Sequence, residues 1–198
     1  NYVLLGLALW LLRKQSLFAP LDLWQRLERP HAPTLAAFAR LGLPAALTVL
    51  VEITSFTLMA LFVARLGTTA TAAHQIAANV TALLYMTPLS LAIATSARVS
   101  YWRGAGDEAR ARKVALQGSA LALVLAALAS LGVLALRPGI AAIYTAHAGV
   151  ALLATRLLAW VALLHVADAV QTLAIFVLRC YRVTLAPFVA YGVLLWGF

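Results

Sequence analysis

Long apolar runs alternate with short polar and basic connectors along the 198 residues of the chain. A membrane-spanning helix needs about 20 predominantly apolar residues, and four stretches are long enough. The pattern therefore predicts an all-α fold, a polytopic transmembrane helix bundle with complete spans at residues 35–66, 72–97, 114–136 and 150–179. Shorter apolar runs at 1–12 and 184–198 indicate the end of one further span and the start of another, so we expect a chain truncated at both ends.

The connectors carry the signals that start and stop helices. Residues 13–34 contain three prolines, and Leu17, Leu21, Trp24 and Leu27 recur there at the spacing of a short helix on the membrane surface, although a plain connector with no other role is the preferred interpretation. Thr34 and Asp107 are candidate N-caps, the latter within the polar loop 98–113. Arg137-Pro138-Gly139 is predicted to end the third span and to open an outer loop at 137–149.

Composition and charge strengthen the membrane prediction. Hydrophobic residues make up 64% of the chain and charged residues 11%, and the net charge is +9. If the connectors at 13–40, 98–113 and 179–182 share one side, that side holds twelve of the 15 basic residues, which places it in the cytoplasm by the positive-inside rule. This distribution explains the charge without nucleic acid binding, for which no aromatic and basic platform exists.

Two of the six acidic residues, Glu52 and Asp168, lie near the middle of predicted spans. Placing an ionisable group at that depth costs about 3 kcal/mol or more, so such groups are rare unless they face a protein interior or a water-filled path. They are candidates for binding Na⁺ or a proton, because burial favours the protonated acid and a bound cation favours the carboxylate. A protonated acid in a structural hydrogen bond between helices is the alternative.

Both acids have polar neighbours at helical spacing. Thr48, Glu52 and Ser55 share one face of the first complete span, whereas Leu50, Ile53 and Leu61 occupy the opposite, lipid-compatible face. On the fourth complete span the polar residues follow a similar spacing: His165, Asp168, Gln171 and Thr172. We expect these two polar faces to meet.

The second complete span has an unusual polar load, namely Gln75, Asn79, Thr81 and Tyr85. Pro88 follows Tyr85 and frees the carbonyl of Leu84, which suits a helix that lines a cavity, although a kink that only shapes packing is an equal reading. Gln75 and Asn79 are expected to face the interior. Tyr85 offers a hydroxyl and an aromatic face to a cation, but it also suits a packed helix interface.

Other chemistries are disfavoured by what the sequence lacks. His74 and His165 have no partners at metal-ligand spacing, so no metal site is expected apart from possible Na⁺ at Glu52 and Asp168. No nucleophile elbow or glycine-rich phosphate loop occurs, so the chain is not expected to be an enzyme or to need a cofactor.

Several segments together resemble one family. They keep order and spacing over nearly the whole chain: Leu47–Phe56 around Glu52, His74–Asn79, Leu84–Pro88, Arg98–Tyr101, and Asp168 followed by Leu178–Arg182. This set is similar to the C-terminal half of NorM-type MATE multidrug efflux transporters. The resemblance implies the six-helix C-terminal lobe of a twelve-helix transporter, from the end of helix 6 to the start of helix 11.

The resemblance also implies a function. Such proteins are multi-pass antiporters of the cell inner membrane that export cationic and amphipathic drugs against Na⁺ or H⁺. Glu52, Asp168 and Tyr85 match positions for the coupling cation, and Gln75 and Phe56 match positions near bound drug; Asn79, Thr48 and Ser55 are added as cavity residues because of their spacing. The expected partners are the drugs, the lipid bilayer and the missing N-terminal lobe.

Two alternatives and one departure accompany this interpretation. A flippase for lipid-linked precursors belongs to the same superfamily, but it needs basic residues at mid-span, and none is present. A structural membrane subunit would not need the two acids. Relatives often carry acidic residues in the outer loop, where this chain has Ala146 and His147, so drug contacts there are not implied.

Overall fold

The computed structural model describes residues 2–14 and 31–197, and all regular structure in them is helical. The helices are α1 Tyr2–Lys14, α2 Ala32–Ala64, α3 Thr68–Gly104, α4 Glu108–Tyr144, α5 Ala148–Cys180 and α6 Leu185–Trp196. Most of the surface helix predicted within residues 13–34 falls outside the described residues.

The chain divides into two compact units at residue 38. In the first unit, the described residues form α1 and the first turns of α2, and α1 buries no side chain. The second unit holds the rest of α2 and helices α3 to α6, and it contains every residue of the candidate site.

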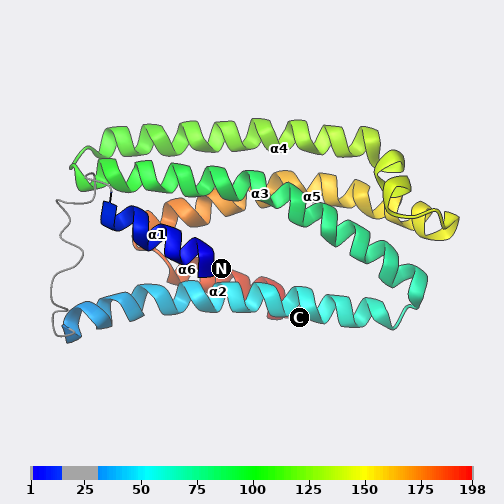
Figure 1. Cartoon of the computed structure of the whole chain (residues 1–198), viewed down its shortest axis with the longest axis horizontal. Coiled ribbons are helices and arrows are strands. Elements are labelled where there is room, and N and C mark those ends of the chain that lie inside the picture. The colour runs from blue at the N-terminus through cyan, green and yellow to red at the C-terminus, as the bar shows by residue number, and fades with distance from the viewer. Residues whose placement is uncertain (1, 15–30, 198) are drawn as a thin grey trace. The chain divides into compact units, whose positions relative to one another are not determined.

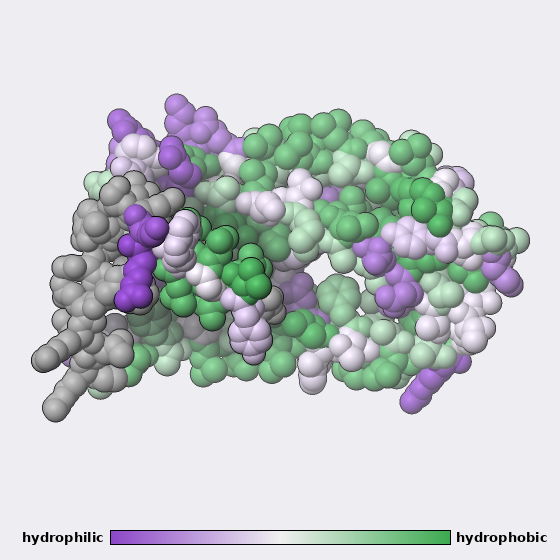
Figure 2. Space-filling model, viewed as in Figure 1, coloured by the Kyte–Doolittle hydropathy of each residue, from purple (hydrophilic) through white to green (hydrophobic). Residues whose placement is uncertain are grey.

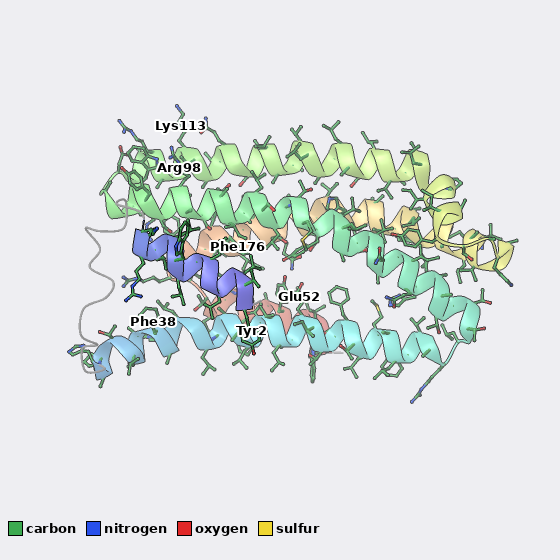
Figure 3. All side chains as sticks on the ribbon, in the orientation of Figure 1. Tyr2, Phe38, Glu52, Arg98, Lys113 and Phe176 are labelled. Carbon is green, nitrogen blue, oxygen red and sulfur yellow. The ribbon has the colours of Figure 1, made fainter. Side chains whose placement is uncertain are left out.

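Four described helices, α2 to α5, are long and apolar enough to cross a membrane, as the apolar pattern predicts. Large apolar side chains are exposed along them, including Leu121, Leu128 and Leu131 on α4. Figure 2 shows this hydrophobic surface over the middle of α4, with hydrophilic residues gathered at one end. Figure 3 places Arg98 and Lys113 at that end. The helices therefore have an apolar side surface and basic residues at one end, as expected for helices that span a bilayer.

Helices α3, α4 and α5 pack side by side and form the core of the second unit (Figure 1). The residues at their contacts are small or medium-sized: Ala73, Ile76, Val80, Val133, Ala141, Val150, Ala154, Leu158 and Ala162 form one buried cluster. Small side chains allow helix backbones to approach closely, which is the main source of packing energy where lipid replaces water. α3 bends near its middle (Figure 1), close to the buried Pro88, and stays helical throughout.

The helices extend beyond several predicted boundaries. α3 continues to Gly104, and α4 begins at Glu108, which leaves only residues 105–107 between them. The prediction that Arg137-Pro138-Gly139 ends the third span is wrong, because α4 continues to Tyr144. The reason is packing, since Val99, Ala111 and Ala141 are fully buried at these extensions and hold the helices in register.

The turns show which capping predictions hold. Asp107 caps α4 and accepts a hydrogen bond from the backbone N–H of Arg110 at 2.9 Å, which confirms the predicted N-cap. Thr34 is not the N-cap of α2, because that helix already begins at Ala32. Gly67 and Gly106 adopt φ angles of 97° and 78°, a left-handed conformation that glycine tolerates without strain.

A polar cluster ties the α3–α4 turn to the end of α5. The Tyr181 hydroxyl donates to Glu108 at 2.6 Å, and Arg103 pairs with Glu108 at 3.4 Å and lies over the Tyr181 ring. Arg103 also donates to the carbonyl of Cys180. The hydrogen bond to Glu108 raises the pKa of Tyr181. The cluster fixes the basic ends of α3, α4 and α5 relative to each other.

Where α3 and α4 approach closely, position 118 has no space for a side chain larger than that of glycine. A Cβ atom there would lie 2.6 Å from the Cγ2 atom and 3.1 Å from the Cβ atom of Thr95, and closer still to its hydroxyl. Rotating Thr95 gives no relief, because all three of its side-chain atoms are in the way. We expect Gly118→Ala to lower the stability of the intact purified protein by about 1–3 kcal/mol, the usual cost of overpacking, measured by thermal unfolding in detergent.

Gly132 provides a matched control on the same helix, because a Cβ atom there would meet nothing within 4 Å. Gly132→Ala should leave stability unchanged or raise it by about 0.5–1 kcal/mol through helix propensity. Adding Thr95→Ala to Gly118→Ala should restore part of the loss. Equal melting temperatures for the two alanine variants would show that α3 and α4 are not this close.

Candidate functional site

Glu52 lies at the middle of α2 and is half-buried. Its side chain points away from α2 on the side where α3 and α5 lie (Figure 3). The opposite face carries Leu50 and Ile53, which are 55% and 58% exposed. The amphipathic division of this span therefore exists as predicted, with the carboxylate directed into the bundle.

The hydroxyls beside Glu52 are occupied within their own helix. Thr48 is buried, and its hydroxyl donates to the carbonyl of Pro44 at 2.8 Å. Ser55 donates in the same way to the carbonyl of Val51 at 2.7 Å. These short bonds satisfy the hydroxyl protons locally, whereas the Glu52 carboxylate makes no described hydrogen bond within its own helix.

Asp168 occupies the corresponding position on α5. It is half-buried between His165 and Thr172, which are only 5% and 6% exposed. Its charge acts on the His165 ring one turn away and on Glu52 across the bundle. In the structure Glu52 therefore lies within the electrostatic reach of Asp168.

Tyr85 joins the acids from a third helix, α3. It is half-buried, interacts with the side chain of Thr172, and lies within the electrostatic reach of both Glu52 and Asp168. The three residues predicted for the coupling cation therefore lie within electrostatic reach of one another from α2, α3 and α5, although Glu52 and Asp168 are more than a hundred positions apart in sequence.

Helix α6 contributes two contacts that the sequence did not predict. The amide of Gln171 donates a hydrogen bond to the hydroxyl of Tyr191, and the indole N–H of Trp196 donates to the hydroxyl oxygen of Ser55 at 3.0 Å. The charges of Glu52 and Asp168 act on Tyr191 as they do on Tyr85. The only sequence signal was an aromatic hydroxyl inside an otherwise apolar run.

The site is rich in oxygen and short of positive charge. Arg179, in the last turn of α5, is the basic residue whose charge acts on Glu52 and Tyr85, more than two turns from Asp168. Among the described residues, no group of three His, Cys, Asp or Glu side chains gathers as a metal cluster would. Two carboxylates with phenol hydroxyls suit a hard monovalent cation or a proton better than a transition metal.

The residues predicted to contact drug do not join this group. Gln75 and Asn79 are on one face of α3, about 15 and 9 Å along the helix axis from Tyr85 at 1.5 Å per residue. Both are exposed in this chain, and Asn79 accepts a hydrogen bond from Tyr144 at 2.7 Å. Phe56 is 57% exposed on α2.

His147, which stands where an acid was expected from the resemblance, has a local structural role. It is the N-cap of α5, and its ring nitrogen accepts a hydrogen bond from the backbone N–H of Val150 at 3.4 Å. The histidine therefore satisfies one of the free backbone N–H groups at the start of α5.

Known proteins are similar to this chain over most of its length. The MatE family model matches residues 44–197. The chain is 36% identical over 91% of its length to a probable multidrug resistance protein NorM of Aromatoleum aromaticum, and 38% identical over 86% to multidrug resistance protein MdtK of Proteus mirabilis. It is 34% identical over 99% to multidrug resistance protein PmpM of Pseudomonas aeruginosa.

The matched region is a similar fraction of the length of each relative. The chain spans 39% of the NorM protein, 38% of MdtK and 41% of PmpM, which is about two fifths of each. The family model covers the carboxylate on α2, the bent helix α3 and the acid on α5 in one continuous match. This chain belongs to the MatE family.

Proposed function

We propose that the chain is the C-terminal lobe of a multi-pass inner-membrane antiporter that exports cationic, amphipathic drugs in exchange for Na⁺ or H⁺. The observation that carries the proposal is the convergence of Glu52 and Asp168, from α2 and α5, beside Tyr85 inside an apolar bundle. Relatives named multidrug resistance proteins support the substrate class.

The coupling step follows from electrostatics. Two nearby carboxylates in an apolar bundle repel each other when both are ionised, and each loses hydration. A cation or proton removes that penalty, so the occupied and empty sites favour different arrangements of the helices that carry them. A ligand shifts a conformational equilibrium only through such a difference in affinity. Ion binding at this site thereby drives the alternation that exports drug.

The proposed contacts with the drug lie on a different surface of the chain. Phe56 and Gln75 are exposed side chains on α2 and α3, and they offer an aromatic ring and an amide to a cationic amphipath. Thr48, Ser55 and Asn79 are less available, because the first two donate to their own helix and Asn79 accepts from Tyr144. The first contacts of the drug are therefore assigned to Phe56 and Gln75.

The alternative functions lack a supporting observation. A flippase for lipid-linked phosphates needs positive charge in its cavity, whereas the basic residue acting on this site is Arg179 at a helix end. A structural subunit would have no use for two opposed carboxylates, which are costly to bury. Both alternatives are tested by the variants below.

Removing either charge should stop transport. In the full-length protein, we expect Glu52→Gln and Asp168→Asn each to reduce ethidium efflux by at least about a hundredfold, because a neutral amide cannot exchange a cation. The assay is fluorescence of ethidium-loaded cells, with protein level in the membrane measured by immunoblot.

Asp107→Asn is the matched control, since it makes the same carboxylate-to-amide change at a helix cap outside the site and asparagine is an equally good cap. It should transport normally. Normal efflux by both site variants would rule out the proposed coupling. Reconstitution in liposomes with Na⁺ and pH gradients imposed separately identifies the driving ion.

Shortening the exposed aromatic ring on α2 should weaken drug binding alone. We expect Phe56→Ala to raise the KM for ethidium by about fivefold, equivalent to one cation–π contact of about 1 kcal/mol. Phe62→Ala is the control, because Phe62 lies on another face of α2, is 62% exposed and contacts Arg65. A similar KM for both variants would remove Phe56 from the drug path.

A further inference from the structure

An open groove between α3 and α4 lies outside the candidate site. Its volume is about 510 Å³, within the range of about 300–1,000 Å³ that small-molecule sites occupy. In Figure 1, α3 lies alongside α4 over its second half and diverges from it on the other side of the bend near Pro88. The residues that line the groove are Met86, Thr87, Ser90, Leu91 and Ala94 of α3 and Leu125 of α4.

The surface of this groove is largely apolar. Four of its six lining residues have apolar side chains, and the hydroxyl of Ser90 donates to the carbonyl of Met86 in its own helix at 2.7 Å. Leu125, on the α4 side, is 36% exposed. A hydrocarbon chain can therefore pack along most of the groove and bury apolar surface on both helices.

The α3 side of the groove leads to Arg98. Leu91, Ala94 and Arg98 follow one another at intervals of three and four residues, so they share one face of α3. Thr87 lies eleven residues before Arg98, which is about 16 Å along the helix axis at 1.5 Å per residue. The hydrocarbon of one leaflet is about 15 Å thick, half of the whole core. The groove and Arg98 therefore match the depth of one leaflet, from its apolar centre to its headgroups.

Lys113 brings a second positive charge to the same end from α4. The contact between Gly118 and Thr95 fixes the register of these two antiparallel helices. Arg98 is then level with residue 115, so Lys113 lies about 3 Å further along the axis. Figure 3 shows both basic residues at this end. Because packed helix axes are about 8–10 Å apart, the two long side chains can reach one common phosphate group.

Arg98 and Lys113 are exposed and have no carboxylate partner in the described part of the chain. The two acids at this end are paired with two other arginines: Glu108 with Arg103 at 3.4 Å and Asp107 with Arg110 at 3.0 Å. The charges of Arg98 and Lys113 are therefore available to an anion from outside the chain. A phosphate group suits them, because it accepts several charge-assisted hydrogen bonds at once.

We propose that the groove between α3 and α4 binds an anionic phospholipid from the leaflet at the basic end of the bundle, with its phosphate at Arg98 and Lys113 and one acyl chain along the groove. A zwitterionic lipid carries the same phosphate, but the two basic residues repel its ammonium group. A headgroup with net negative charge is therefore the better match. The proposal is independent of the coupling function of Glu52 and Asp168.

The test is the dissociation constant for one molecule of dioleoyl phosphatidylglycerol, measured by native mass spectrometry on the purified full-length protein. Dioleoyl phosphatidylcholine, which has the same acyl chains, should bind more weakly. Arg98→Gln and Lys113→Gln should each raise the constant for phosphatidylglycerol about fivefold, and together about thirtyfold, as expected for basic residues near a membrane surface. Arg112→Gln is the matched control, because it makes the same change beside Lys113 but about 100° around the helix. It should leave the constant unchanged.

A second pair of variants tests the acyl-chain part of the site. Ala94→Phe puts a ring into the groove and should raise the constant for phosphatidylglycerol at least about tenfold, because the chain loses its buried surface. Ala120→Phe is the control, since Ala120 is exposed on α4 and does not line the groove. Inorganic phosphate at the same concentration as the lipid should not displace it, because phosphate has no chain to bury.

Several results would overturn the proposal. Equal affinity for the two lipids, or the same loss in Arg112→Gln as in Arg98→Gln, would mean a general attraction to the basic end. Displacement by inorganic phosphate would make the free anion the ligand. Unchanged lipid binding in Ala94→Phe would mean that the groove holds something else, either another segment of the protein or a drug. In the case of a drug, Ala94→Phe would weaken ethidium binding instead.

Discussion

The burial of two acids, Glu52 and Asp168, in an apolar bundle is the constraint that the candidate site has to meet. An apolar bundle would be more stable with leucine at both positions, since each ionised group gives up hydration and gains a like-charged neighbour. The pair is tolerable only when a cation or proton neutralises it or when donors from other helices surround it. The phenols of Tyr85 and Tyr191 lie within the electrostatic reach of both acids, whereas the basic Arg179 acts on Glu52 and Tyr85 from the end of α5.

The helices around the pair are held in two different ways. α3, α4 and α5 are joined by backbone-close packing of small residues, of which Gly118 against Thr95 is the tightest, and by the cluster of Arg103, Glu108 and Tyr181 at one end. Between α2 and α6, the described residues make one side-chain hydrogen bond, from Trp196 to Ser55. Asp168 therefore lies on a helix of the packed frame, and Glu52 lies on a helix that a single described hydrogen bond joins to α6.

Much of this was predictable because it depends on local pattern. Four spans follow from the length of apolar runs, and Glu52 and Asp168 stand out because acids are expensive in such runs. The prediction that the third span ends at Pro138 was wrong, because burial of Ala141 keeps α4 helical beyond the proline, a residue that ends many helices. Tyr191 was missed because its significance depends on how α6 lies against α2 and α5, which no periodicity within α6 reveals.

Hydroxyl residues show why polar content alone does not define a site. Four hydroxyl side chains donate to the carbonyl four residues earlier in their own helices: Thr48, Ser55, Thr81 and Ser90. Their hydrogen-bonding capacity is therefore largely satisfied within their own helices. A carboxylate has no proton to donate when ionised and finds no free N–H inside a helix. It must take its partners from other helices or from solution. For that reason the acids, rather than the more numerous hydroxyls, are the groups in these helices that need partners from outside their own helix.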